Sequence, residues 1–215
     1  MDSYQSYIHA SRYARWLEDK ERRETWDETV DRWWNYMTDK FPVLGKRQDV
    51  KDAIYNLDVV PSMRTIMTAG EALDRNQVAA YNCSFLAVDD PKAFDEALLV
   101  LMCGTGVGFS VERQFIQKLP EVPAELVPTD EVIKVADSKE GWAKALRQLI
   151  SRLYAGEIPT WDVSKVRPAG ARLKTFGGRA SGADPLVNLF KFTVTTFKKA
   201  AGRQLNSLEC HDLMC

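Results

Sequence analysis

The segment from residue 82 to residue 111 constrains the fold of this chain more than any other. Residues 82–88 have the composition of a strand, and Asp90 followed by proline is typical of a helix start. The helix carries a run of apolar side chains and ends at Gly104, after which residues 107–111 form a second candidate strand. A strand, a helix and a strand within about thirty residues form a right-handed parallel crossover by default. The segment therefore predicts an α/β fold.

Four more helices are predicted from caps and apolar spacing. Thr25 and Glu28 form a capping-box pattern ahead of a helix over 26–39, and residues 46–57 are a candidate for a shorter second helix. Asp137 and Glu140 form a similar pattern ahead of an apolar face that ends at Gly156. A further apolar helix is expected over 185–200. Residues 121–128 and 161–184 are predicted to be loops, and the second of these, with four glycines, is expected to be functional.

Composition excludes several classes of function. The chain is 45% hydrophobic and 27% charged with a net charge of −1, so there is no electrostatic argument for binding nucleic acid or a membrane surface. No signal peptide and no apolar run of about 20 residues is present, which predicts a cytoplasmic protein. Four cysteines without a CxxC pair predict reduced thiols.

The cysteines allow two kinds of interpretation. Cys210, His211 and Cys215 lack a fourth ligand and a usual zinc spacing, so no metal site is predicted. Cys103 is expected to pack inside its helix. A lone cysteine in an apolar strand, such as Cys83, is usually a small buried hydrophobe.

Several motifs follow one another in an order that resembles a known family. They are PSMRTIMTAG at 61–70, YNCSF at 81–85, GTGVGFSV at 104–111, DSKEGW at 137–142 and VRPAGARLKTFGGRASGADPL at 166–186. The order resembles the N-terminal half of the catalytic domain of the monomeric, adenosylcobalamin-dependent (class II) ribonucleoside-triphosphate reductases. The resemblance implies an N-terminal helical region at 1–57 and, at 58–215, the first half of a ten-stranded α/β barrel, with effector and specificity segments at about 120–182.

The resemblance assigns roles to particular residues. Cys83 would face the substrate and supply one of the two thiols that reduce it, and substrate contacts are implied for Ser62, Asn82, Gly106 and Gly108. A glycine turn allows a ligand to lie against backbone, although a simple tight turn is the alternative interpretation of this motif. Asp137 and Ser138 are either effector contacts or only a helix cap. The effector and specificity residues that the resemblance implies are Asp90, Asp137, Ser138, Arg167, Ala169, Gly170 and Lys174.

The same resemblance implies the reaction and its participants. The substrate would be a ribonucleoside triphosphate, the cofactor adenosylcobalamin, the regulator a deoxynucleotide effector and the reductant a thioredoxin-type protein. The family's radical-bearing cysteine, its neighbouring glutamate and the second redox cysteine are not found here. We therefore expect a chain that is inactive and prone to aggregate alone, and that needs a second chain with the missing half. No ATP-cone precedes the first helix, so overall control by ATP and dATP is not expected.

Two alternatives stay open. The chain could be a non-catalytic nucleotide-binding half or regulatory fragment that works with a second polypeptide. It could also be a thiol redox protein, which the missing CxxC motif disfavours.

Overall fold

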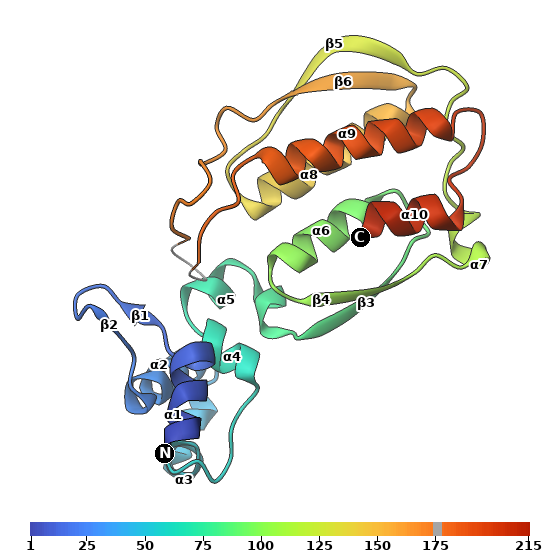
Figure 1. Cartoon of the computed structure of the whole chain (residues 1–215). Helices are drawn as coiled ribbons and strands as arrows, with labels where there is room; N and C mark the ends of the chain where they lie inside the picture. Colours follow the sequence, from blue (N-terminus) through green and yellow to red (C-terminus); the bar gives the residue numbers. More distant parts are fainter. Residues whose placement is uncertain (174–177) are drawn as a thin grey trace. The chain divides into compact units, whose positions relative to one another are not determined.

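The computed structural model describes residues 1–173 and 178–215. The chain divides into two compact units (Figure 1). The first comprises Met1–Asn82 with Leu173–Gly178, and the second comprises Cys83–Arg172 with Arg179–Cys215. The first unit thus runs on to residue 82, beyond the boundary at residue 57 that the sequence predicts.

The first unit is mainly helical. Its helices are α1 (Ser3–Ile8), a π-helical turn (His9–Tyr13), α2 (Trp26–Lys40), a 3-10 turn (Pro42–Lys46), α3 (Gln48–Tyr55), α4 (Met63–Thr68), α5 (Glu71–Arg75) and a 3-10 turn (Gln77–Ala80). A short antiparallel pair, β1 (Trp16–Leu17) and β2 (Arg22–Arg23), precedes α2. The predicted second helix is thus shorter than 46–57, since its first residue belongs to a 3-10 turn.

The longest helix of this unit begins where its capping box predicts. The Glu28 amide donates to Thr25 Oγ1 at 3.3 Å, and the Thr25 amide donates to the Glu28 carboxylate at 2.9 Å. These two bonds satisfy amides that have no partner inside the helix. The buried face of α2 forms a small apolar core with α3 and α4, made of Val30, Trp33, Trp34, Ile54, Ile66 and Ala69.

The second unit contains two strand–helix–strand crossovers. The first is β3 (Cys83–Ala87), α6 (Lys92–Met102) and β4 (Gly106–Ser110), with β3 and β4 parallel, as the sequence predicts. After α7 (Arg113–Ile116), the second crossover is β5 (Val127–Lys134), α8 (Lys139–Tyr154) and β6 (Glu157–Asp162), again with parallel strands. The helices α9 (Asp184–Lys199) and α10 (Ser207–Met214) follow. In Figure 1, β5 and β6 arch over α8 and α9, while α6 and α10 lie beside β3 and β4.

The strands β5 and β6 correct the sequence prediction. The loop predicted over 121–128 overlaps β5, which begins at Val127. The loop predicted over 161–184 begins only after Asp162, the last residue of β6. Pro128 lies within β5, and a proline argues against a strand when the sequence is read alone. It is tolerated here because β5 pairs only with β6 among the described strands, so its other edge needs no backbone amide as a donor. Ile133 is buried, so β5 still contributes to the core.

The start of α8 corrects the predicted cap. Ser138, not Asp137, is the N-cap, because its Oγ accepts the Gly141 amide at 3.0 Å. Gly141 is needed there, since a Cβ at this position would lie 2.5 Å from the Ala136 carbonyl oxygen. The first helical turn can therefore approach the end of β5 closely.

One extended core holds the second unit together. It is formed by the inner faces of α6, α8, α9 and α10, and its largest fully buried side chains include Leu149, Ile150, Leu153, Phe190 and Phe197. Within the residues that are described, no helix is both long and apolar enough to cross a bilayer.

Candidate functional site

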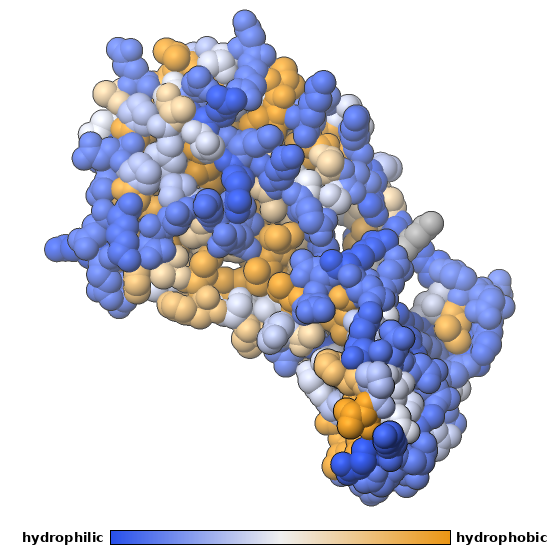
Figure 2. Space-filling model, turned by 180° about the vertical axis from the view of Figure 1, so that it is seen from behind, coloured by the Kyte–Doolittle hydropathy of each residue, from blue (hydrophilic) through white to orange (hydrophobic). Residues whose placement is uncertain are grey.

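The strand pair β3–β4 has one face on the core and one face that the second unit leaves uncovered. Leu86, Val107 and Phe109 pack against the core. Since side chains alternate along a strand, Cys83 and Phe85 lie on the opposite face. The Phe85 residue is 70% exposed and Cys83 is also exposed. Apolar surface is visible at the lower edge of this unit, where Figure 1 shows β3 and β4 (Figure 2).

Glycines lie beside both exposed side chains of this face. Cys83 pairs with Gly106 and Phe85 pairs with Gly108 in the register of the two strands. Paired residues of neighbouring strands project to the same side, so the thiol and the ring are flanked by bare backbone. The Ser84 hydroxyl donates to the Gly106 carbonyl oxygen at 3.1 Å. We call the face formed by Cys83, Phe85, Gly106 and Gly108 the thiol face.

The other cysteines differ from Cys83 in exposure. Cys103 is buried at the end of α6, where Lys139 Nζ lies 3.3 Å from its Sγ, as expected for a packing residue. Cys210 is fully buried, and burial raises the pKa of its thiol to about 12. Cys215 is exposed, with its Sγ 3.6 Å from His211 Nε2. All four cysteines are free, so Cys83 is available as an accessible thiol.

Two predicted substrate contacts belong to the first unit. Ser62 is exposed and precedes α4, where its carbonyl oxygen accepts the Ile66 amide at 3.1 Å and the Thr65 hydroxyl at 2.9 Å. Its own hydroxyl makes no cap bond to the helix. Asn82 is exposed and is the last residue of the unit's long segment. Gly106 and Gly108 lie with Cys83 in the second unit.

An ion pair joins the ends of β5 and β6. The Asp137 carboxylate, in the connection from β5 to α8, accepts Arg167 Nε at 2.8 Å and the Arg167 amide at 3.2 Å. Arg167 follows β6, so the pair ties together the chain segments that leave the carboxyl ends of two parallel strands. Ligands of α/β proteins commonly bind at such strand ends. Asp137 and Arg167, both predicted as effector residues, are therefore brought together.

The segment after Arg167 is a loop held by its own backbone. The Gly170 amide donates to the Ala180 carbonyl oxygen at 2.8 Å, and the Ala180 amide donates to Ala171 at 2.7 Å. Gly170 has a φ of +84°, which favours glycine. Ala169 lies close to Gly182, because a Cβ on Gly182 would lie 3.0 Å from the Ala169 amide nitrogen. Lys174, also predicted for this loop, lies outside the described residues.

The remaining predicted effector residues act as caps. Asp90 accepts the Lys92 amide at 2.8 Å at the start of α6, and Ser138 caps α8 as described above. Both interactions are those of ordinary helix starts. The alternative interpretation of Ser138 as a cap thus has a structural basis.

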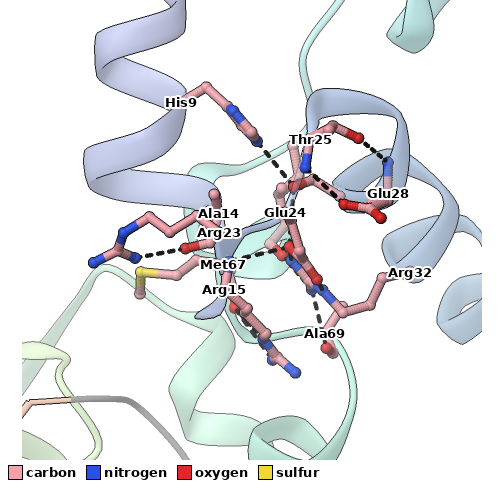
Figure 3. A network of polar contacts seen from close by, with 12 residues as sticks. His9, Ala14, Arg15, Arg23, Glu24, Thr25, Glu28, Arg32, Met67 and Ala69 are labelled. Carbon is pink, nitrogen blue, oxygen red and sulfur yellow. Dashed lines mark hydrogen bonds and ion pairs between the residues drawn. The ribbon is translucent and has the colours of Figure 1, made fainter. Parts of the chain in front are cut away.

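The first unit also contains a buried polar network that the sequence analysis did not predict. It links His9, Arg15, Glu24, Thr29 and Arg32 (Figure 3). Glu24 directly precedes the capping-box threonine, which is the one local signal that could have drawn attention to it. Its partners are distant in sequence, so no local pattern reveals them.

Comparison with known proteins finds one family. The model of the insertion domain of B12-dependent ribonucleotide reductases matches residues 121–196, which hold β5, α8, β6 and most of α9. An adenosylcobalamin-dependent ribonucleoside-triphosphate reductase from Lactobacillus helveticus (strain DPC 4571) is 28% identical over 275 residues, covering 94% of this chain and 37% of the relative. The reductase of that name from Lactobacillus delbrueckii subsp. bulgaricus (strain ATCC BAA-365 / Lb-18) is 29% identical over 270 residues, covering 94% and 36%.

A solved structure agrees with these sequence matches. The crystal structure of a B12-dependent (class II) ribonucleotide reductase superposes with a TM-score of 0.83 at 25% identity, covering 97% of this chain and 39% of the other. The chain spans less than two fifths of the length of the curated relatives it matches. The resemblance inferred from the motifs is confirmed: in sequence and in fold, this chain is similar to the N-terminal portion of the adenosylcobalamin-dependent ribonucleoside-triphosphate reductases.

Proposed function

We propose that this chain forms the N-terminal part of an enzyme that reduces ribonucleoside triphosphates to 2′-deoxyribonucleoside triphosphates. The observation that carries the proposal is the position of Cys83, an exposed thiol on a strand face whose neighbouring positions are glycines. Similarity to ribonucleoside-triphosphate reductases along 94% of the chain supports this chemistry over a general thiol redox role.

The chemistry that Cys83 would contribute is a reduction. Replacement of the 2′-hydroxyl by hydrogen consumes two electrons and two protons and releases water. Two thiols supply both when they close to a disulfide, so Cys83 provides one half of the reductant and a second cysteine the other half. A thioredoxin-type dithiol would then reduce the disulfide and restore both thiols.

Gly106 and Gly108 would leave room for the substrate beside the thiol. With no side chain at Gly106 or Gly108, a ribose or base can lie flat on the backbone beside the thiol. We infer that the thiol face lines the interior of the reductase barrel, and that further strands pair with the free edges of β3 and β4. Ser62 and Asn82 are proposed as additional substrate contacts.

Adenosylcobalamin is the cofactor we propose for the whole enzyme. When bound, it supplies the initiating radical by homolysis of its cobalt–carbon bond. The two histidines of the chain are otherwise engaged, since His9 is buried against Thr29 and His211 contacts Phe109 and Cys215. We therefore assign no cobalt ligand to this chain, and its residues act on the nucleotide instead.

The Asp137–Arg167 pair and the loop that follows it are proposed as the effector-responsive part. The match of the insertion-domain model over 121–196 supports this assignment. A deoxynucleotide effector would interact through the guanidinium of Arg167, a group that suits phosphate recognition, and would compete with Asp137 for it. Asp90, Ser138, Ala169 and Lys174 remain predictions for the same site.

The test is a substitution of Cys83 in the complete reductase that contains this chain. Cys83→Ser should abolish multiple turnover with thioredoxin or dithiothreitol and leave the nucleotide dissociation constant within a few-fold, because serine has similar volume but forms no disulfide. Cys215→Ser, at the other exposed cysteine, is the matched control and should retain turnover. Undiminished turnover by the Cys83 variant would refute the assignment.

A second candidate is a nucleotide-binding module without catalytic cysteine chemistry. It is favoured by the Asp137–Arg167 pair at the carboxyl ends of β5 and β6, where a ligand could bind without any thiol. Under this alternative, Cys83→Ser would affect neither turnover nor binding, whereas substitutions on the glycines would still weaken binding.

A further inference from the structure

The buried network of the first unit centres on Glu24 (Figure 3). Only 6% of this residue is exposed, and its carboxylate accepts Arg32 Nε at 2.7 Å and Arg32 Nη2 at 2.9 Å. It also accepts the Arg15 amide at 3.1 Å and the Thr29 hydroxyl at 3.0 Å. Burial acts to raise the pKa of Glu24, but the hydrogen bonds and charge of Arg32 outweigh it and lower the pKa. The carboxylate is thus ionised, with both oxygens in use.

Both arginines extend from this carboxylate to the carboxyl end of α4. Arg32 Nη1 donates to the Ile66 carbonyl oxygen at 2.8 Å and to that of Ala69 at 3.2 Å. Arg15 donates from Nε and Nη2 to the Met67 carbonyl oxygen at 3.3 and 3.2 Å. The last carbonyl groups of a helix have no partner within it and carry a partial negative charge. Here two cations from distant parts of the sequence supply the missing donors.

The position of Arg15 is fixed on a second side by glycine. Gly70 has a φ of +108°, and a Cβ at this position would lie 3.3 Å from Arg15 Nη1. Glycine immediately after α4 therefore allows the guanidinium to approach the helix end. This close approach would not be needed if Arg15 only neutralised Glu24.

A fixed arrangement of protons completes the network. His9 Nε2 lies 2.9 Å from Thr29 Oγ1, whose single proton is donated to Glu24. The Nε2 atom of His9 must therefore carry the proton and donate it to Thr29. Burial lowers the pKa of His9, so its ring is neutral in the network. The ring also packs edge-on against Trp26, with centroids 5.6 Å apart.

We infer that Glu24, Arg32 and Arg15 are positioning residues that orient the start of α4, including Ser62, for contact with the nucleotide. The inference rests on the proposed function, in which Ser62 contacts the substrate. The helix α4 has six residues, too few to keep its shape without packing or capping. Because Ser62 makes no side-chain cap, the helix is fixed by the packing of Ile66 and by the bonds to its carboxyl end. The Ile66 amide, bonded to the Ser62 carbonyl oxygen at 3.1 Å, passes that constraint to the start.

Arg32→Lys in the full chain tests this role. Lysine keeps the charge, but its single ammonium group cannot reproduce the planar fork that contacts a carboxylate and two carbonyl oxygens together. Arg22→Lys is the matched control. Arg22 makes a comparable fork with Glu28, at 2.7 and 2.8 Å, but Arg22 is exposed, Glu28 is only partly buried, and the bonds of Arg22 go to Arg23 and Glu28 rather than to α4.

Amide hydrogen exchange is the first measurement. Amides of residues 66–69 should exchange at least tenfold faster in Arg32→Lys, while amides in the middle of α2 and all amides of the control keep their wild-type rates. Unchanged exchange at 66–69 would overturn the inference. Uniform acceleration throughout the first unit would also overturn it, because it would mean that Arg32 only stabilises the fold.

A second variant and a binding measurement complete the test. If Arg32→Lys fails to fold, Arg15→Lys is used instead, since the Arg15 side chain contacts the Met67 carbonyl oxygen rather than the Glu24 carboxylate. The dissociation constant for ATP should rise at least tenfold in the variant with selective exchange and stay constant in Arg22→Lys. Selective exchange with an unchanged ATP affinity would overturn the positioning role. Absence of ATP binding by the wild-type complete reductase would instead contradict the proposed function, and the exchange result would still decide whether the network orients α4.

Discussion

Gly108→Ala separates a binding role of the thiol face from a folding role. A Cβ on Gly108 would lie 3.7 Å from the Ser84 carbonyl oxygen, which is an ordinary van der Waals contact, and the position does not need a positive φ. The folded state should therefore accept alanine without strain. Alanine also restricts the unfolded chain, so the free energy of unfolding should stay constant or rise by about 0.4–1 kcal/mol.

The same methyl group should weaken nucleotide binding. The methyl group would project from the thiol face beside Phe85, at the position where the proposed substrate would lie against the backbone. We expect the dissociation constant of a ribonucleoside triphosphate in the complete reductase to rise at least tenfold, which corresponds to about 1.4 kcal/mol, and further in Gly108→Val.

Calorimetric titration and thermal unfolding of the same samples measure both quantities. Gly45→Ala is the control, because a Cβ there would have nothing within 4 Å and lies outside the thiol face. Full affinity with lower stability would refute the reasoning, since it would show that glycine at position 108 serves only the fold.

The remaining predictions concern thiols, packing and pH. Thiol reagents should modify Cys83 rapidly and Cys210 last, because Cys210 is buried and its pKa is raised to about 12; equal rates measured by mass spectrometry would contradict this. Gly141→Ala should lower the free energy of unfolding by about 1–3 kcal/mol in denaturant titrations, despite the better helix propensity of alanine, since the added methyl collides with backbone. His9 has a lowered pKa when folded, so the unfolded state binds the proton more readily, and stability should be full above pH 6.5 and fall as the pH drops below it. His9→Gln should show a shallower loss over this pH range, and an identical slope would contradict the assignment.

The sequence predicts the first crossover well because its signals are local. Asp90 and the glycine after α6 mark the ends of the helix, and the apolar runs on either side form strands. The second crossover was missed because Pro128 and the acidic residues of β5 resemble a loop when read alone. What makes this segment a strand is the pairing with β6 and the burial of Ile133, both of which depend on residues more than twenty positions away.

For the site residues too, local sequence signals predict some features and long-range packing determines the others. The exposure of Cys83 follows from strand alternation, but only the packing of α6 and α10 on the other face decides which of the two faces stays uncovered. The caps of Asp90 and Ser138 were open to two interpretations, and geometry favours the local one. The contacts of Glu24 with Arg32 and of Arg32 with the end of α4 link segments with no shared sequence pattern, so only a structure reveals them.

Within the second unit, an ion pair between a buried carboxylate and a half-exposed guanidinium connects α6 with α8. Asp95 on α6 is 4% exposed, and its carboxylate accepts Arg147 Nε from α8 at 2.9 and 3.0 Å. The helix α6 joins the two strands of the thiol face, and α8 begins next to the Asp137–Arg167 pair. Because the Arg147 side chain is 46% exposed, solvent screens the pair, and its contribution is about 1 kcal/mol or less, as for other exposed ion pairs. Because that energy does not exceed the coupling energies of about 1–3 kcal/mol usual between two sites, an effector that shifts α8 would act on α6 mainly through the apolar core that the two helices share.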